Sequence, residues 1–277
     1  MAIALNERTV VMVGGEDRLT FLDGLVTCST KTLAPGALAY GALLTPQGKI
    51  LTDLFVHTRD DHLFLDLPAS AAADIVRRLT MYKLRAAVTL ETTDAAVILG
   101  EGPPDPRAVT VSVALDGAVD GFDVGGRSIG VGTPGDAAPY HAARIAAGIP
   151  DAVLDFELGD AFPHDANMDI TGAVDFQKGC FVGQEVVSRM RHRGTARRRT
   201  VRVSADAPLP ETGAPVTANG RVIGRLGTTV GAAGLAVVRI DRVKGEVKAG
   251  DVTVRLAPPP GATFALAGEE ASEGAGA

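Results

Sequence analysis

The segment with the most chemical potential places a thiol between two glycines. It reads Lys178-Gly179-Cys180-Phe181-Val182-Gly183-Gln184-Glu185. Gly179 and Gly183 allow backbone conformations and close approaches that a Cβ would block, so the segment predicts a turn that presents Cys180 just before a helix. Positive charge from Lys178 and from the arginines that follow would favour the thiolate, the reactive form of cysteine. The alternative interpretation is that Cys180 is a small buried hydrophobic residue.

The second cysteine, Cys28, lies far from Cys180 in the sequence. Neither thiol has a neighbour at metal-ligand spacing, and two thiolates cannot complete the four-ligand shell of an iron–sulfur cluster or a structural zinc. We therefore predict no resident metal, and a cluster would need ligands from a partner. The first residues do not resemble a secretion signal, and no apolar run is long enough to cross a bilayer. Reduced thiols, a cytoplasmic location and no membrane partner are expected.

The elements that must position this thiol mix helices and strands without a regular alternation. At 277 residues and 46% hydrophobic content, the chain favours two or three compact units. Hydrophobic periodicity predicts a strand over 9–14, a helix over 16–26, an antiparallel meander over 37–45, 50–58 and 62–67, a helix over 70–84 and strands over 87–90 and 96–99. Ser70 is the expected cap of the second helix.

The second half of the chain predicts weak strands at 109–113 and 121–131, a helix over 137–147 that Gly148 ends, and short strands at 199–203, 215–217, 221–230, 236–240 and 252–256. The regular spacing of the last set indicates a small β-barrel. The predicted fold class is α+β with antiparallel sheets. We expect two interleaved α+β lobes over 1–188, the barrel over 195–265 and a disordered tail over 266–277.

The segment around Cys180 closely resembles the Lys-Gly-Cys-Tyr-x-Gly-Gln-Glu signature of the YgfZ family, with Phe181 in place of the tyrosine. The resemblance extends to residues 15–25, 43–54, 144–150 and 162–169. It implies a three-lobed fold, related to the glycine-cleavage aminomethyltransferases, around a channel that binds tetrahydrofolate. Members of that family are implicated in maintaining certain iron–sulfur enzymes, including radical enzymes that modify tRNA.

Two departures from the related enzymes bear on activity. In aminomethyltransferases of this fold an acidic pair follows the glycine turn, and its first aspartate acts on the folate; here the pair reads Thr52-Asp53. Threonine cannot act as a general base near neutral pH, so the resemblance argues against glycine-cleavage chemistry. Asp53 is expected to be a solvated or capping residue. The family's Thr-Asn-Asp stretch is also altered, to Thr27-Cys28-Ser29, and Cys28 is expected in the core.

Four residues are the candidates for contact with folate. Tyr140 aligns with a folate-contacting tryptophan of the family and offers the flat surface that a pterin needs, although ordinary packing at a helix start would also explain it. Arg8 stands where the family has a second such tryptophan and could meet the glutamate tail of folate. Arg144 and Asn167 lie in two other stretches that match the family.

A run of basic residues follows the thiol segment, comprising Arg189, Arg191, His192, Arg193, Arg197, Arg198 and Arg199. It could dock an acidic partner, a folate tail or the phosphates of a tRNA, although such a run is usually a solvated face. The formal net charge of −6 confines any nucleic-acid role to a local patch.

Three functional interpretations follow. The first is a tetrahydrofolate-binding accessory protein that supports the assembly or repair of iron–sulfur enzymes, with iron–sulfur enzymes or assembly proteins as partners and Cys180 at its centre. The second is a folate-dependent aminomethyltransferase or demethylase, which Thr52 disfavours. The third is a tRNA-binding module, which would require the basic run to form a continuous surface.

Overall fold

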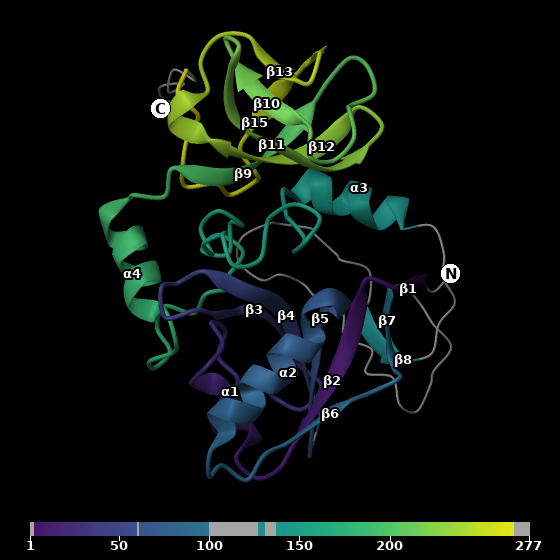
Figure 1. Cartoon of the computed structure of the whole chain (residues 1–277), viewed down its shortest axis with the longest axis vertical. Helices are drawn as coiled ribbons and strands as arrows, with labels where there is room; N and C mark the ends of the chain where they lie inside the picture. The colour runs from purple at the N-terminus through teal and green to yellow at the C-terminus, as the bar shows by residue number, and fades with distance from the viewer. Residues whose placement is uncertain (1–2, 60, 100–126, 131–136, 269–277) are drawn as a thin grey trace, which may run out of the picture.

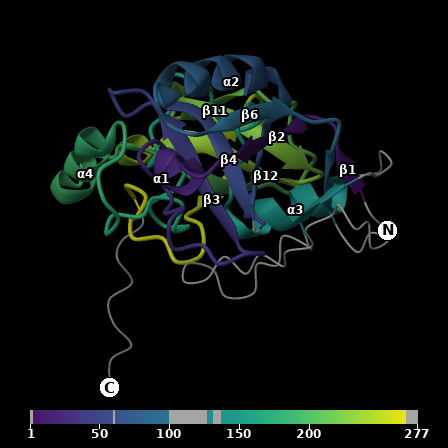
Figure 2. The ribbon, with the colours of Figure 1, turned by 90° about the horizontal axis from the view of Figure 1, so that it is seen from below.

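A five-stranded antiparallel sheet forms the N-terminal lobe. A computed structural model of the chain describes residues 3–59, 61–99, 127–130 and 137–268 (Figure 1). In this sheet the strands run in the order β3 (Leu38–Leu44), β4 (Ile50–Thr58), β5 (Leu63–Pro68), β2 (Arg8–Gly14) and β6 (Thr89–Thr92). Helices α1 (Arg18–Asp23) and α2 (Ala69–Lys83) accompany it, and Figure 2 shows α2 covering its outer face.

The central strands of this sheet are buried on both faces, which their continuous apolar character requires. In β3, Leu43 packs into a core shared with the inner side of α2, whereas Ala42 and Leu44 pack into a second core. That second core contains Phe156, Phe181 and other residues of the segment between α3 and α4. Because successive side chains of a strand point to opposite faces, one strand joins the two cores.

A seven-stranded antiparallel sheet closes the other end of the molecule. Its order is β14 (Val252–Thr253), β13 (Val247–Ala249), β10 (Pro215–Ala218), β11 (Arg221–Val230), β12 (Ala233–Arg239), β9 (Arg198–Ser204) and β15 (Arg255–Ala257), with a 3-10 turn at Ile240–Arg242. The two edge strands, β14 and β15, follow each other in the chain, so the sheet curls round into a nearly closed barrel.

A small sheet and two helices complete the fold. A three-stranded sheet has the order β1 (Ile3–Leu5), β7 (Ala96–Leu99) and β8 (Arg127–Gly130). Helix α3 (Ala138–Ala147) lies between this region and the barrel strands β11 and β12 (Figure 1). Helix α4 (Gln184–Arg193) stands at the edge of the molecule and buries one residue, Val187.

The predicted fold class, α+β with antiparallel sheets and a C-terminal barrel, is confirmed. Several details were wrong. The first helix is shorter than 16–26, and Pro68, not Ser70, occupies the cap of α2, where no side chain makes a capping bond. Strand β13 had no predicted counterpart. Leu266, assigned to a disordered tail, is buried in the barrel core. The strand predicted at 109–113 and residues 269–277 lie outside the described residues.

The part of the chain that the structure describes contains no helix that is both long and apolar enough to cross a membrane.

A buried arginine ties α3 to the barrel. The Arg144 guanidinium donates to the carboxylate of Asp155 at 3.0 Å, to Thr228 Oγ1 of β11 at 3.0 Å and to the carbonyl of Ile149 at 2.8 Å. Burial alone would lower the pKa of Arg144, but Asp155 and Asp151 raise it above its usual range. The helix therefore cannot leave the barrel without exposing a buried ion pair.

We expect Arg144→Met to lower the free energy of unfolding by about 3–5 kcal/mol, because the substitution leaves the Asp155 carboxylate buried without its cation. Chemical unfolding followed by circular dichroism measures this. The matched control is Arg255→Met, which removes the exposed pair with Asp206 and should leave stability unchanged within error. Equal effects of the two substitutions would contradict the role of Arg144 in holding α3 against the barrel.

Candidate functional site

Cys180 is exposed on the loop that leads into α4, and a buried lysine fixes that loop on one side. The Lys178 ammonium donates to the carbonyl oxygens of Val26 at 2.9 Å and Cys28 at 2.6 Å, and it lies 3.5 Å from the Asp23 carboxylate. The Lys178 charge is thus directed at the N-terminal lobe, and its expected effect on the Cys180 thiolate stays a prediction. Burial lowers the pKa of Lys178, which Asp23 partly opposes.

The other side of the loop is fixed by packing and backbone conformation. Phe181, where the family signature has tyrosine, is buried in the second core. Gly183 has a φ of +82°, and a Cβ there would lie 2.6 Å from the Thr45 carbonyl oxygen, so only glycine fits. Gly179 has open space around it and no left-handed φ, so the predicted need for glycine at that position was wrong. The loop thus presents an exposed thiol between two anchors.

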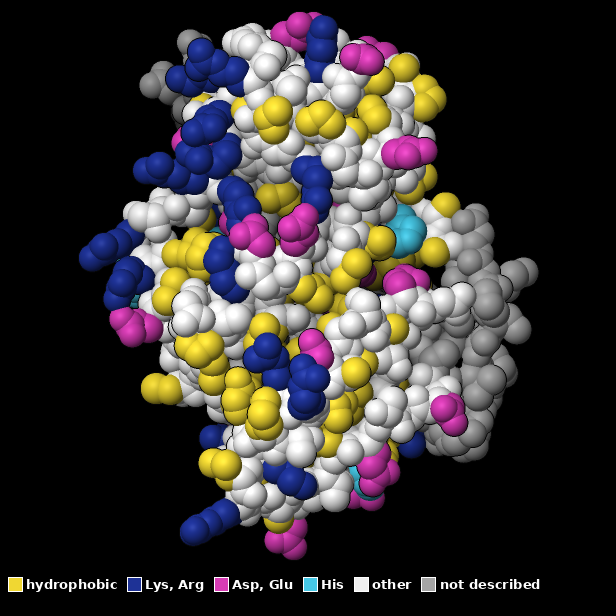
Figure 3. Space-filling model, in the orientation of Figure 1, with side chains coloured by type: hydrophobic (Ala, Val, Ile, Leu, Met, Phe, Trp, Pro, Cys, Tyr) yellow, Lys and Arg dark blue, Asp and Glu magenta, His cyan; other side chains and the backbone are white. Residues whose placement is uncertain are grey.

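Gln184 and Glu185 begin α4, and the basic run starts on this helix. Figure 3 shows Lys and Arg side chains gathered along the edge formed by α4 and the neighbouring part of the barrel. Arg189 pairs with Glu185 on the same helix, and the Arg191 guanidinium stacks 4.1 Å from the centre of the Phe176 ring.

The last two arginines of the basic run are paired with carboxylates. Arg198 pairs with Asp160 and Asp165, and the buried Arg199 makes a two-pronged contact with Asp169. Arg198 and Arg199 are therefore neutralised by ion pairs.

Cys28 lies in the core, as expected. It is 4% exposed, and burial raises the pKa of its thiol to about 12 although Lys178 lowers it. A protonated, enclosed thiol is a poor nucleophile and a poor metal ligand. The two cysteines therefore have different chemistry, and Cys180 alone is accessible.

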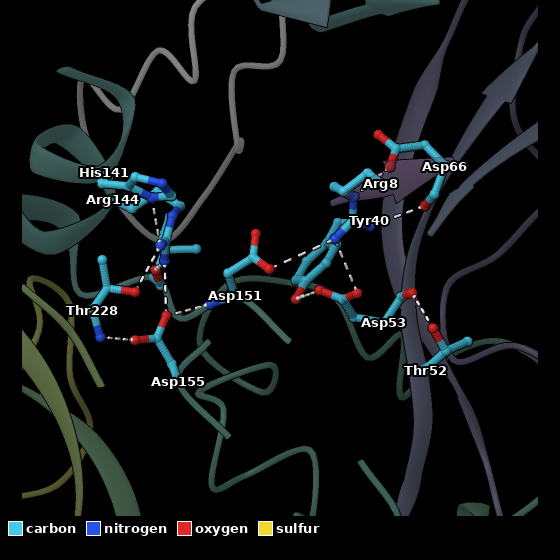
Figure 4. A network of polar contacts seen from close by, with 11 residues as sticks. Arg8, Tyr40, Thr52, Asp53, Asp66, His141, Arg144, Asp151, Asp155 and Thr228 are labelled. Carbon is cyan, nitrogen blue, oxygen red and sulfur yellow. Dashed lines mark hydrogen bonds and ion pairs between the residues drawn. The ribbon is translucent and has the colours of Figure 1, made fainter. Parts of the chain in front are cut away.

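The centre of the molecule holds a buried network of charged groups that the sequence did not indicate (Figure 4). The Arg8 guanidinium donates to the Asp66 carboxylate and, at 3.2 Å, to Asp53 Oδ1. The Tyr40 hydroxyl donates to the other oxygen of Asp53 at 3.2 Å. Asp151 Oδ1 lies 3.9 Å from the same guanidinium. Arg8 thus joins three strands to the segment that follows α3.

This network corrects two expectations. Arg8 is 4% exposed and engaged by carboxylates, so it is not available to the glutamate tail of a folate. Burial would lower the pKa of Arg8, but Asp53 and Asp66 raise it well above its usual range. Asp53 is 2% exposed, not solvated, because its charge is matched by Arg8.

Thr52 is fully buried, and its hydroxyl donates to the Asp53 carbonyl at 2.8 Å. Strand β4 therefore presents no free carboxylate at the positions where the related enzymes carry their acidic pair. A threonine hydroxyl is not a general base at neutral pH, and the Asp53 carboxylate is engaged by Arg8 and Tyr40.

The remaining candidates are divided between structural contacts and packing. Asn167, with a φ of +56°, donates to the Thr200 carbonyl of β9 at 2.9 Å. Tyr140 is half-buried against Leu5, Val10 and Val97, with the Arg144 guanidinium 5.5 Å from its ring centre. Arg144 and Asn167 thus hold the barrel in place, and the role of Tyr140 towards folate stays a prediction.

A cavity of about 310 Å³ adjoins the buried network. Its lining comprises Glu7, Arg8, Pro68, Ala69, Ser70, Asp151, Ala152, Val153 and Leu154. This volume is at the lower end of the range for small-molecule sites, and the walls are largely apolar. Sequence analysis missed Asp151; the one available signal was its place directly after the Arg144–Pro150 stretch that matches the family.

We expect iodoacetamide at pH 8 to alkylate Cys180 in the folded protein and to leave Cys28 unmodified, because only Cys180 is exposed and the pKa of Cys28 lies at about 12. Mass spectrometry of tryptic peptides measures the two sites, and the unfolded chain, in which both react, is the control. Comparable labelling of Cys28 in the folded state would contradict the assigned roles.

Comparison with known proteins places this geometry in context. A family model described as the CAF17 C-terminal beta-barrel domain matches residues 197–264. The chain is 30% identical to "Iron-sulfur cluster assembly factor IBA57, mitochondrial" of Mus musculus, in an alignment that covers 87% of this chain and 78% of the relative. The Homo sapiens protein of the same name is 27% identical with the same coverage.

The fold has a counterpart among solved structures. The glycine cleavage system aminomethyltransferase T from Bartonella henselae superposes with a TM-score of 0.73 at 17% identity, over 93% of this chain and 84% of that one. At that identity the likeness concerns the fold alone. The sequence relatives define the family: the chain belongs to the IBA57/CAF17/YgfZ family of iron–sulfur cluster assembly factors.

Proposed function

We propose that this chain is a tetrahydrofolate-binding accessory protein that supports the assembly or repair of iron–sulfur enzymes through the Cys180 thiol. The observation that carries the proposal is an exposed cysteine on a loop that is anchored by Lys178 on one side and by Phe181 and Gly183 on the other. An anchored loop costs little further ordering when a partner binds, so it suits a thiol that must meet a partner.

The thiol alone limits what the chain can do with a cluster. Cys180 is the one exposed cysteine, whereas a cluster of the common kinds takes four protein ligands. Cys180 therefore acts on a partner's cluster or thiol, and the partner supplies the other ligands. The exposed cations Arg191, Arg193 and Arg197 on and after α4 provide a contact surface for an acidic partner.

Tetrahydrofolate fits the cavity beside Asp151 in part. The apolar walls suit the two-ring head of a folate, and the Asp151 carboxylate can accept its N–H groups. Arg8, in contrast, is engaged and cannot hold the glutamate tail. Tetrahydrofolate supplies one-carbon chemistry in other proteins; here Thr52 and the engaged Asp53 favour its use as a bound ligand over aminomethyl transfer.

The proposed clients include enzymes that modify tRNA, and the proposed compartment is the cytoplasm, although the curated relatives are named as mitochondrial. Direct tRNA binding is the weaker form of this link, because Arg198 and Arg199 are paired with carboxylates. A gel shift with tRNA over a range of salt concentrations separates direct contact from an effect through client enzymes.

The thiol proposal is tested by rescue of iron–sulfur enzyme activity in cells that lack the protein. Cys180→Ser should abolish rescue and leave the melting temperature unchanged, because an exposed serine is nearly isosteric but stays protonated. Cys28→Ser is the matched control and should retain rescue. It should lower the melting temperature by a few degrees, because a hydroxyl in a buried site without a partner costs about 1–3 kcal/mol. Full rescue by Cys180→Ser would overturn the proposal.

The folate proposal is tested by anaerobic calorimetric titration with tetrahydrofolate. Tyr140 does not line the cavity beside Asp151, so it tests a contact outside that cavity: if its ring stacks on the folate, Tyr140→Ala should weaken binding by about 1–3 kcal/mol. Tyr82→Ala, at an exposed tyrosine of α2, is the control and should leave the affinity unchanged. Unchanged affinity in Tyr140→Ala would remove this residue from the site, and no saturable binding by the native chain would remove folate from the proposal.

A further inference from the structure

The carboxylate of Asp151 is buried without a hydrogen bond. The side chain is 8% exposed, and its nearest cation, the Arg8 guanidinium, is 3.9 Å away, which is beyond hydrogen-bonding distance. No donor among the described residues reaches either carboxylate oxygen. A carboxylate that is largely buried, makes no hydrogen bond to the described residues and lines a cavity is available to accept bonds from a ligand.

The charges around Asp151 do not balance either. Arg8 faces Asp53, Asp66 and Asp151, and Arg144 faces Asp155 (Figure 4). Two guanidinium groups therefore stand among four carboxylates, with the His57 ring 3.8 Å from Asp66. Asp53, Asp66 and Asp155 each have a direct ion pair at hydrogen-bonding distance, so the excess negative charge falls on Asp151.

Asp151 lines the 310 Å³ cavity, whose walls include Pro68, Ala69 and Leu154. At the same cavity Val153 adopts a φ of +73° and is 53% exposed. A β-branched residue in the left-handed region is strained, and such strain is concentrated at functional sites. The cavity thus combines an unsatisfied carboxylate, apolar walls and a strained residue at its edge.

We infer that Asp151 is the recognition group of a small-molecule site, where its carboxylate accepts two N–H bonds from a flat ring such as the aminopyrimidine end of a pterin. Two free oxygens in one plane match a planar pair of donors. The apolar walls favour a flat, weakly hydrated group over a strongly hydrated ammonium. This inference rests on the proposed folate binding and names the residue that orients the ligand.

The ionised form of Asp151 is the binding form, so affinity should depend on pH. The groups that face it are Arg8 of β2, Asp53 of β4, Arg144 of α3 and Asp155 of its own segment, with Glu7 at the edge of the cavity. Burial raises the pKa of Asp151 to about 6, although Arg8 lowers it. Affinity for a neutral donor ligand should therefore rise between pH 5 and pH 7.5.

The raised pKa of Asp151 also predicts how the stability of the folded protein depends on pH. A carboxyl whose pKa is raised by folding stabilises the native state while it is protonated, and that contribution is lost as the pH rises through about 6. Asp151→Asn is nearly isosteric and never ionises. It should raise the melting temperature by several degrees at pH 8 and by about half as much at pH 5, which lies between the unfolded pKa of about 4 and the folded one; this is the pattern of a residue kept for function at the expense of stability.

The experiment combines calorimetric titration and thermal unfolding of the full chain. The probes are tetrahydrofolate, 6-methyltetrahydropterin as the head alone and p-aminobenzoylglutamate as the tail alone. Asp151→Asn should weaken binding of the first two by about 10- to 100-fold, as expected for loss of charged hydrogen bonds. The control Glu7→Gln removes an exposed carboxylate of the same cavity and should change affinity less than twofold.

The outcomes separate this inference from the folate proposal. If the native chain binds tetrahydrofolate and Asp151→Asn binds equally well, the assignment of Asp151 is overturned and folate binding stands. If the native chain binds none of the probes, the folate proposal and the assignment of Asp151 are both overturned. A melting temperature that drops at pH 8 in Asp151→Asn would make Asp151 a structural counter-ion of Arg8 and would also overturn the assignment.

Discussion

The arrangement of the lobes depends on one buried guanidinium. Arg8 enters the centre of the molecule from β2 and meets carboxylates of β4, β5 and the segment after α3. Removing Arg8 would leave several buried carboxylates without their cation, which is far more costly than losing an exposed pair. These strands and that segment are therefore held in one relative position, and both the cavity beside Asp151 and the second core are built on it.

The two parts of the candidate site differ in how far the sequence predicts them. Cys180 is signalled locally, because the flanking residues that shape its loop are its neighbours in the chain. Asp53 and Asp151 carry no such signal, since an isolated aspartate is usually exposed and its burial is justified only by a partner that is distant in sequence. Arg8 was assigned to a ligand for the same reason: a lone arginine gives no indication of the three carboxylates that fold around it.

The predicted helices and strands also divide into those with a clear local sequence pattern and those without one. Strands β2, β4, β5 and β11 follow clear apolar patterns and were predicted close to their observed bounds. The three-residue strand β13 has too few residues to show a pattern, and the cap of α2 was misassigned because Ser70 has the right chemistry two residues too late. Leu266 was placed in a tail because its neighbours are small, whereas a single leucine suffices to close the barrel core.

The contacts of Lys178 link residues that are far apart in the sequence. Its ammonium binds the carbonyls of Val26 and Cys28, and the backbone N–H of Asp175 donates to the Thr27 carbonyl. The N-terminal lobe is therefore complete only after the thiol segment has been synthesised. Contacts between residues that are distant in sequence form late in folding. In the barrel, β10–β11, β11–β12 and β13–β14 pair consecutive strands, whereas β9 pairs with β12 and β15. A Cys180 loop that is anchored through Lys178 therefore indicates a folded N-terminal lobe. A chain that lacks this lobe would carry the Cys180 thiol on an unanchored loop.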